Sequence, residues 1–242
     1  MGQEALVQQD IFVNLSAPAR ALVDEIESHT AIEIRVLAKS DRGDGWVGEA
    51  KDESAVGVIT GPQSIVIESP TNVQDVTDED YIHELLHLHR IYIVNVPHLY
   101  PRKTSDGNAA AVIDNWLEHI VIYKRQIELC TGFYQKVNAG LIEYWQRCPW
   151  DATGSDLKFN LLSRYMITHR YGSTEAKKAM ADAIQSLGLP FSLRNVARQC
   201  SKVIVDKHLL VARVLQFCDV PTDLFWLRRY DVMNQKAVWI PI

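Results

Sequence analysis

The chain has 242 residues, a hydrophobic share of 47% and a net charge of −5. These values predict a globular protein with one substantial core and exclude a largely disordered chain. The amino terminus MGQEALVQQD lacks the basic and apolar regions of an export signal, and no apolar run approaches the roughly 20 residues needed to cross a bilayer. We therefore expect a cytoplasmic protein with no membrane partner and with its four widely spaced cysteines reduced.

The charge is distributed unevenly along the chain. Residues 1–155 contain 12 basic and 23 acidic side chains, whereas residues 156–242 contain 13 basic and 7 acidic ones. This asymmetry has two interpretations, an acidic partner for the carboxyl-terminal half or attraction between two lobes of the protein. We favour the second, because the basic residues are dispersed. Pairs such as Lys177-Lys178 and Arg228-Arg229 do not indicate a nucleic-acid partner.

The first part of the chain predicts a helix followed by strands. Leu22, Val23 and Ile26, spaced among charges in APARALVDEIESH, indicate an amphipathic helix. The alternating, β-branched stretch AIEIRVLA predicts a strand starting near Ala31. After the glycine-rich loop SDRGDGWVGEAKDES, the segments VGVIT and SIVIES predict a hairpin across Gly61-Pro62-Gln63.

Helical periodicity dominates the remainder of the chain. Thr77 and Asp80 form an acidic capping box, which predicts a helix from near Asp78 to about Ile93. The segment VPHLYPRKTSDGN, with two prolines and a glycine, predicts a loop. Further helices are predicted from Asn108 or Ala109 through Ile127, from Phe133 to Trp145, Leu157 to His169, Thr174 to Leu187 and Ser192 to Phe217, with KAVWIPI as a terminal strand.

The segment HELLHLHR, residues 83–90, contains the spacing of a zinc-binding helix. His83 and His87 lie four positions apart and therefore project from the same side of a helix, so that both imidazoles can bind one metal ion. Glu84 is offset by about 100°, which places it beside the metal and able to take a proton from bound water. A histidine-rich helix face without metal would carry the same letters, but the apolar spacers Leu85 and Leu86 favour the metal-binding interpretation.

A catalytic zinc site needs a third protein ligand, and the next long helix offers candidates in DNWLEHIVIYKRQ. Glu118 shares its helix face with apolar residues, where a carboxylate requires either a cation or a metal. Arg125, two turns away, is the alternative partner. His119 points about 100° away from Glu118, which makes it a second candidate for ligand and a candidate for polarising a substrate carbonyl.

The pattern H-E-L-L-H followed by a helix with N-W-L-E-H resembles the gluzincin branch of zinc metallopeptidases, and the order of elements from about Ala31 to Cys130 resembles the compact ImmA/IrrE-like members. The resemblance implies an α+β, zincin-like fold: a small amino-terminal β-sheet, the HExxH helix, the glutamate helix and a mostly helical carboxyl-terminal lobe. It implies a metallopeptidase core at residues 1–130 and a lobe at 131–242 that closes the cleft. His83, His87 and Glu118 would bind Zn²⁺ and Glu84 would be the general base. The strand SIVIES would pair with an extended peptide.

These observations predict a zinc-dependent cytoplasmic peptidase of a regulatory or defence-related kind, acting on a protein or peptide substrate. Its oxyanion would be stabilised by a hydrogen-bond donor, for which His119, Tyr123, Tyr165, His169 and Arg90 are chemically competent. His119 and Tyr123 are the preferred catalytic candidates beside Glu84. The alternative is a non-catalytic binding protein in which the zincin scaffold recognises another protein.

Overall fold

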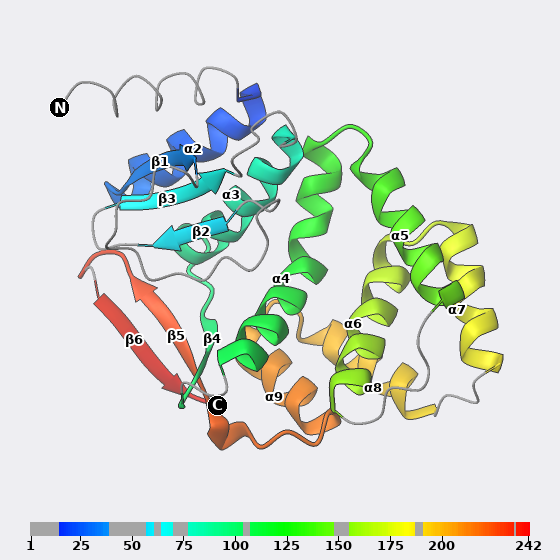
Figure 1. Ribbon diagram of the computed structural model, residues 1–242. Helices are drawn as coiled ribbons and strands as arrows, with labels where there is room; N and C mark the ends of the chain where they lie inside the picture. Colours follow the sequence, from blue (N-terminus) through cyan, green and yellow to red (C-terminus); the bar gives the residue numbers. More distant parts are fainter. Residues whose placement is uncertain are drawn as a thin grey trace. The chain divides into compact units, whose positions relative to one another are not determined.

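The computed structural model describes residues 15–38, 57–60, 64–69, 77–103, 107–147, 155–186, 191–234 and 236–242 (Figure 1). The described chain is α+β and mostly helical, which confirms the predicted fold class. It divides into two compact units, one formed by Met1–Asn95 with Asp231–Lys236 and the other by Val96–Tyr230 with Ala237–Ile242. The predicted division of roles between residues 1–130 and 131–242 stays a prediction, as does the zincin-like arrangement.

The first unit contains a three-stranded mixed sheet with the strand order β1-β3-β2. Strand β1 (Glu33–Ala38) is parallel to β3 (Ser64–Ser69), and β2 (Gly57–Thr60) is antiparallel to β3. The predicted hairpin is therefore confirmed as the β2–β3 pair. The loop SDRGDGWVGEAKDES lies outside the described residues.

Helix α2 (Ala17–Thr30) precedes the sheet and packs against helix α3 (Asp78–Tyr92). Its buried face includes the predicted Leu22, Val23 and Ile26, and these apolar contacts hold the two helices together. At its end Ala31 adopts a left-handed conformation, with φ of 56°, and its N–H donates to the Glu27 carbonyl.

Helix α3 begins where its capping box predicts. The Asp80 carboxylate accepts a hydrogen bond from the Thr77 backbone N–H at 3.0 Å, and Asp78 accepts one from the Ser16 N–H at 2.9 Å. Three acidic residues in the first turn also suit the positive end of the helix dipole. The start of α3 is thereby held by its own N-cap residue, Thr77, and by Ser16, which is the N-cap residue of α2.

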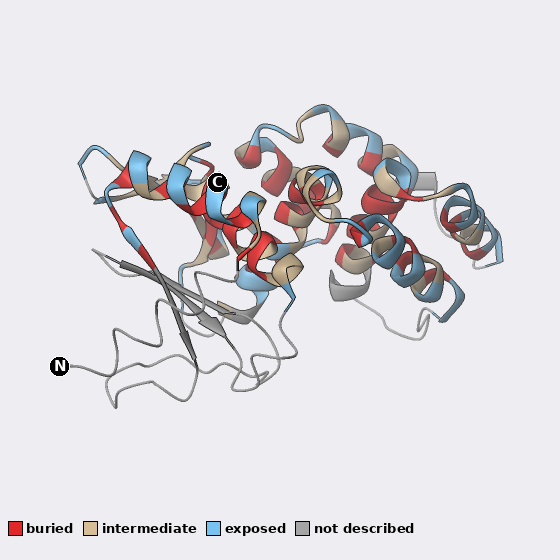
Figure 2. Cartoon of the chain, turned by 90° about the horizontal axis from the view of Figure 1, so that it is seen from above, coloured by how far each residue is buried: buried red, intermediate tan, exposed pale blue. Residues whose placement is uncertain are grey.

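The second unit is a helical assembly with a small sheet. Its helices are α4 (Gly107–Leu129), α5 (Phe133–Arg147), α6 (Ser155–Tyr171), α7 (Thr174–Ser186), α8 (Phe191–Lys202), α9 (Lys207–Phe217) and the short 3-10 helix η4 (Thr222–Leu224). Buried positions recur along one side of these helices (Figure 2) and form a continuous core that includes Leu117, Met166, Val211 and Phe225. No helix of the described chain has both the length and the apolar character that a bilayer-spanning segment needs.

Two predictions for this unit are wrong. The single helix predicted from Ser192 to Phe217 is divided into α8 and α9, because Val203 turns back through a hydrogen bond to the Cys200 carbonyl and Asp206 caps the next helix by accepting from the Leu209 N–H at 3.0 Å. Part of the predicted loop at residues 96–108 is strand β4 (His98–Pro101).

Strand β4 is extended because a distant strand pairs with it. It is antiparallel to β5 (Phe225–Asp231), with Leu99 opposite Leu227 and Tyr100 opposite Trp226. Strand β6 (Lys236–Pro241), predicted as a terminal strand, completes the order β4-β5-β6. The sequence near residue 98 carries no information about a partner more than a hundred residues away, which explains why this sheet was not predicted.

Candidate metal centre

His83 and His87 come together on α3 as their spacing predicts. Their Nε2 atoms lie 3.3 Å apart, and their rings meet edge to face with centroids 4.9 Å apart. Two nitrogen ligands on a tetrahedral zinc ion, with bonds of about 2.0 to 2.1 Å, stand about 3.3 to 3.4 Å from each other. The pair therefore has the separation that two zinc ligands require, although an N–H···N hydrogen bond has a similar length. Both side chains are half-buried, which leaves them access to an ion.

Glu84 lies beside this pair and is unusually basic for a carboxylate. Burial, together with the nearby Asp80 carboxylate, raises the pKa of Glu84 to about 7. A group with that pKa exchanges its proton near neutral pH, which suits a general base that later acts as an acid.

Helix α3 is held by packing and by its third histidine, His89. Apolar residues such as Leu85 and Leu88 are fully buried, and His89 Nε2 lies 3.2 Å from Glu25 Oε1 on α2. His89 is itself buried. The contact between His89 and Glu25 joins α3 to α2. His89 is more deeply buried than His83 and His87, which are half-buried.

On α4, the carboxylate of Glu118 is bound by a lysine. Its side chain is only 1% exposed, and Oε1 lies 2.5 Å from Lys207 Nζ on α9. The cation of this pair is Lys207, whereas the sequence indicated Arg125 as the alternative to a metal. Glu118 as a zinc ligand stays a prediction. To bind a metal, its carboxylate would have to contact both Lys207 and the metal ion.

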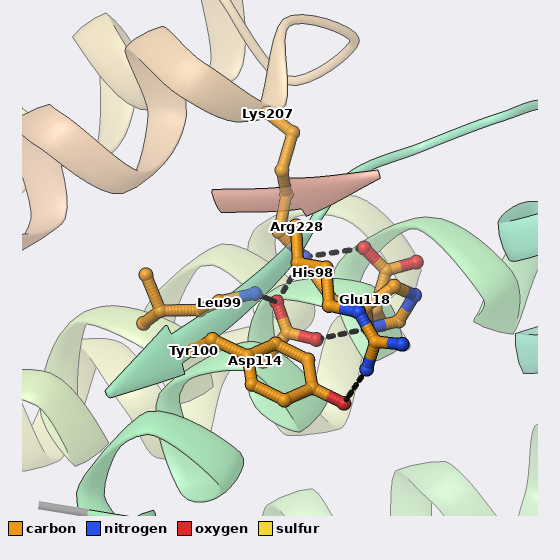
Figure 3. Close-up of polar contacts among 7 residues, drawn as sticks. All are labelled: His98, Leu99, Tyr100, Asp114, Glu118, Lys207 and Arg228. Carbon is orange, nitrogen blue, oxygen red and sulfur yellow. Dashed lines mark hydrogen bonds and ion pairs between the residues drawn. The ribbon is translucent and has the colours of Figure 1, made fainter. Parts of the chain in front are cut away.

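Lys207 also binds Asp114, one turn before Glu118 (Figure 3). Its Nζ lies 2.8 Å from Asp114 Oδ1, and Asp114 in turn accepts a hydrogen bond from the Leu99 N–H at 3.0 Å and lies 2.5 Å from His98 Nδ1 through Oδ2. The histidine that Asp114 orients is therefore His98 of β4. His98 and Lys207 were both missed, because nothing in the local pattern of either residue identifies a partner on α4.

In this network, the paired charges change the pKa values of Asp114 and Lys207 more than burial does. Burial by itself raises the pKa of Asp114, but Lys207 and His98 lower that pKa well below its usual range. Burial by itself lowers the pKa of Lys207, but Asp114 and Glu118 raise it above its usual value. We conclude that a charged Lys207 and a charged Asp114 carboxylate are retained inside this unit.

His119 and Tyr123 form an aromatic stack on α4. Their ring centroids are 5.2 Å apart with planes inclined by 19°, and the Trp116 ring meets His119 edge to face at 5.6 Å. Burial raises the pKa of Tyr123, while Arg164 and Lys136 oppose this effect. Tyr123 is therefore a neutral hydrogen-bond donor at physiological pH, and its ring fixes one face of the His119 imidazole.

The other candidates for the oxyanion role occupy different surroundings. Tyr165 is buried on α6 and stacks on the exposed His169, with centroids 6.2 Å apart, whereas Arg90 is half-buried on α3. These positions do not select one of them, and the assignment of the oxyanion donor to His119 or Tyr123 stays a prediction.

Comparison with known proteins gives no independent assignment of this site. No protein-family model, no curated protein and no solved structure matches the chain.

Proposed function

We propose that this protein is a zinc-dependent peptidase in which His83, His87 and His119 bind the metal and Glu84 is the general base. The three histidines are a group that could hold a metal ion. The observation that carries the proposal is the 3.3 Å separation of the His83 and His87 Nε2 atoms, because it matches two corners of a tetrahedral site.

His119 is preferred to Glu118 as the ligand from α4. The Glu118 carboxylate is engaged by Lys207 at 2.5 Å in a position that is almost fully buried, whereas the His119 side chain is half-buried. Three imidazoles are a donor set that catalytic zinc sites use, with a fourth position left for water. The stacked Tyr123 ring supports the His119 orientation, as residues around metal ligands commonly do.

A zinc ion held by these donors would supply Lewis-acid chemistry, polarising a carbonyl and lowering the pKa of a bound water. Glu84 would accept the proton of the attacking water and return it to the amine that leaves. With His119 as a ligand of the metal, Tyr123 would donate a hydrogen bond to the carbonyl oxygen as negative charge develops there.

The proposal is tested by measuring metal content and peptide hydrolysis on the same preparations. Wild-type protein should contain about one zinc ion per chain and cleave members of a peptide mixture analysed by mass spectrometry. Glu84→Gln should keep the zinc and lose most of the hydrolysis, whereas Glu79→Gln on the same helix should keep both. Full activity in Glu84→Gln would remove Glu84 from this role, and zinc without hydrolysis in the wild type would favour the non-catalytic alternative.

A further inference from the structure

The outer face of the sheet β4-β5-β6 carries a row of aromatic and basic side chains. Successive residues of a strand point to opposite faces, and Phe225 and Leu227 of β5 are buried in the core. Trp226 and Arg228 therefore lie on the other face. Tyr100 of β4 is paired with Trp226 across the strands and lies on the same face.

Arg228 lies beside two aromatic rings on this face. Its Nη1 donates to the Tyr100 hydroxyl at 2.7 Å (Figure 3), and its guanidinium carbon lies 5.0 Å from the Tyr100 ring centroid and 5.8 Å from that of Trp239 on β6. The Tyr100 and Trp239 rings meet edge to face at 5.6 Å. The arginine and both rings are thus held in place by their contacts with one another.

A second arginine extends the row. The Arg102 guanidinium lies 4.0 Å above the Trp226 ring, and its side chain and that of Lys103 are exposed. Within the described part of the chain, no carboxylate forms an ion pair with Arg102 or Arg228. We call Tyr100, Arg102, Trp226, Arg228 and Trp239 the aromatic–arginine face, and its charge is positive.

The exposure of Trp239 is the second sign of a binding surface. Trp239 is 51% exposed although it is a large aromatic side chain on a strand. Exposed aromatic area beside arginines that form no ion pair with a carboxylate of the described residues fits a ligand that has both flat rings and negative charge.

We propose that the aromatic–arginine face binds single-stranded nucleic acid. Bases would stack on Trp239 and Tyr100, and Arg102, Lys103 and Arg228 would neutralise phosphates. The sheet brings together basic residues that are dispersed in the sequence, which is why the sequence did not indicate this partner. A duplex would be a poor ligand, because its bases are stacked on each other. This binding goes beyond the proposed peptidase function and does not depend on the metal.

The experiment uses the full chain and a fluorescein-labelled oligothymidylate of about 12 nucleotides in a fluorescence anisotropy titration at low salt. Binding should be tighter than to a duplex of the same length and should persist in EDTA, which separates it from the zinc site. Trp239→Ala should weaken binding about 5- to 150-fold, whereas Trp239→Phe should retain most of it. Tyr134→Ala, which removes an exposed aromatic ring from α5, is the matched control and should bind as the wild type does.

Salt dependence gives a second, independent readout. Arg102→Ala should lower the slope of log affinity against log salt concentration by about 0.7, the contribution of one phosphate contact, and Arg198→Ala should leave the slope unchanged. Arg102 is exposed, so this variant is expected to fold. The proposal is overturned if no oligonucleotide binds at low salt, if the duplex binds equally well, if folded Trp239→Ala binds like the wild type, or if polyglutamate binds and the oligonucleotide does not.

Discussion

Lys207 Nζ lies 2.5 Å from Glu118 Oε1, although 89 residues separate them in the chain. The same ammonium group lies 2.8 Å from Asp114 Oδ1, so that one buried cation joins α9 to two successive turns of α4. These helices belong to one compact unit, and α4 is the helix that carries His119. The network is therefore a structural support of the helix on which the third proposed ligand stands.

Removing the cation should destabilise the protein strongly. In Lys207→Met, two buried carboxylates lose their shared partner, and breaking a buried pair in this way typically costs about 3 to 5 kcal/mol. The free energy of unfolding, measured by urea denaturation, should fall by this amount. Lys178→Met removes the lysine of an exposed pair with Asp182 and should leave the denaturation midpoint unchanged. Equal midpoints for Lys207→Met and the wild type would show that the buried network contributes nothing.

Acid should weaken the same network through Asp114. The pKa of Asp114 is lower in the folded protein than in the unfolded chain, so its contribution to stability is fully present above about pH 4 and is lost as the pH falls toward the folded value. The difference in unfolding free energy between wild type and Asp114→Asn should therefore be largest at neutral pH and shrink below about pH 4. Asp182→Asn provides the exposed control. A difference that stays constant down to about pH 2 would contradict the assignment.

The choice between His119 and Glu118 as zinc ligand can be made by affinity. Loss of a true ligand should weaken zinc binding by more than the roughly 10- to 100-fold typical of residues that only orient a ligand. We expect this larger loss in His119→Ala and in His83→Ala, and a smaller one in Glu118→Gln. Competition with a chromophoric chelator measures it, and His169→Ala on the exposed surface of α6 is the control. The reverse order would make Glu118 the ligand, as the sequence first indicated.

Glu84 should make the metal-free protein less stable. Its folded pKa of about 7 lies above the unfolded value, so its ionisation is disfavoured by folding, and stability is lost as the pH rises between about 4.3 and 7. In EDTA, Glu84→Gln should therefore be more stable than the wild type above neutral pH, by up to about 3 kcal/mol, and equally stable below about pH 4. Urea denaturation at both ends of this range measures the effect. A destabilised Glu84→Gln would mean that the carboxylate is needed for the fold.

The parts of the fold that were predicted correctly rest on local signals. The period of Leu22, Val23 and Ile26 predicts α2, and the Thr77–Asp80 capping box predicts the first residue of α3. The proximity of His83 and His87 follows from helix geometry alone. These features need no knowledge of the rest of the chain.

The parts that were missed rest on contacts between distant segments. Strand β4 exists because β5 pairs with it, and the buried charge of Glu118 is balanced by Lys207, whose own sequence context is an ordinary helix start. The single helix predicted for residues 192–217 is wrong for a similar reason. The apolar periodicity continues through this segment, and the local sequence does not show that Asp206 caps a new helix. The sequence indicated that the Glu118 carboxylate requires a cation or a metal, but it did not indicate that Lys207 is that cation.

The late position of Lys207 has a consequence for synthesis on the ribosome. Residues 114 and 118 leave the exit tunnel long before residue 207 is made. Strand β4 is also made long before residues 225–231, with which it pairs. At about 5 to 20 residues per second, helix α4 therefore remains for several seconds without its cation, and strand β4 remains without its partner strand. During that interval the nascent second unit exposes carboxylates and an unpaired strand edge, and it reaches its final packing only after residues 207 and 225–231 have been made.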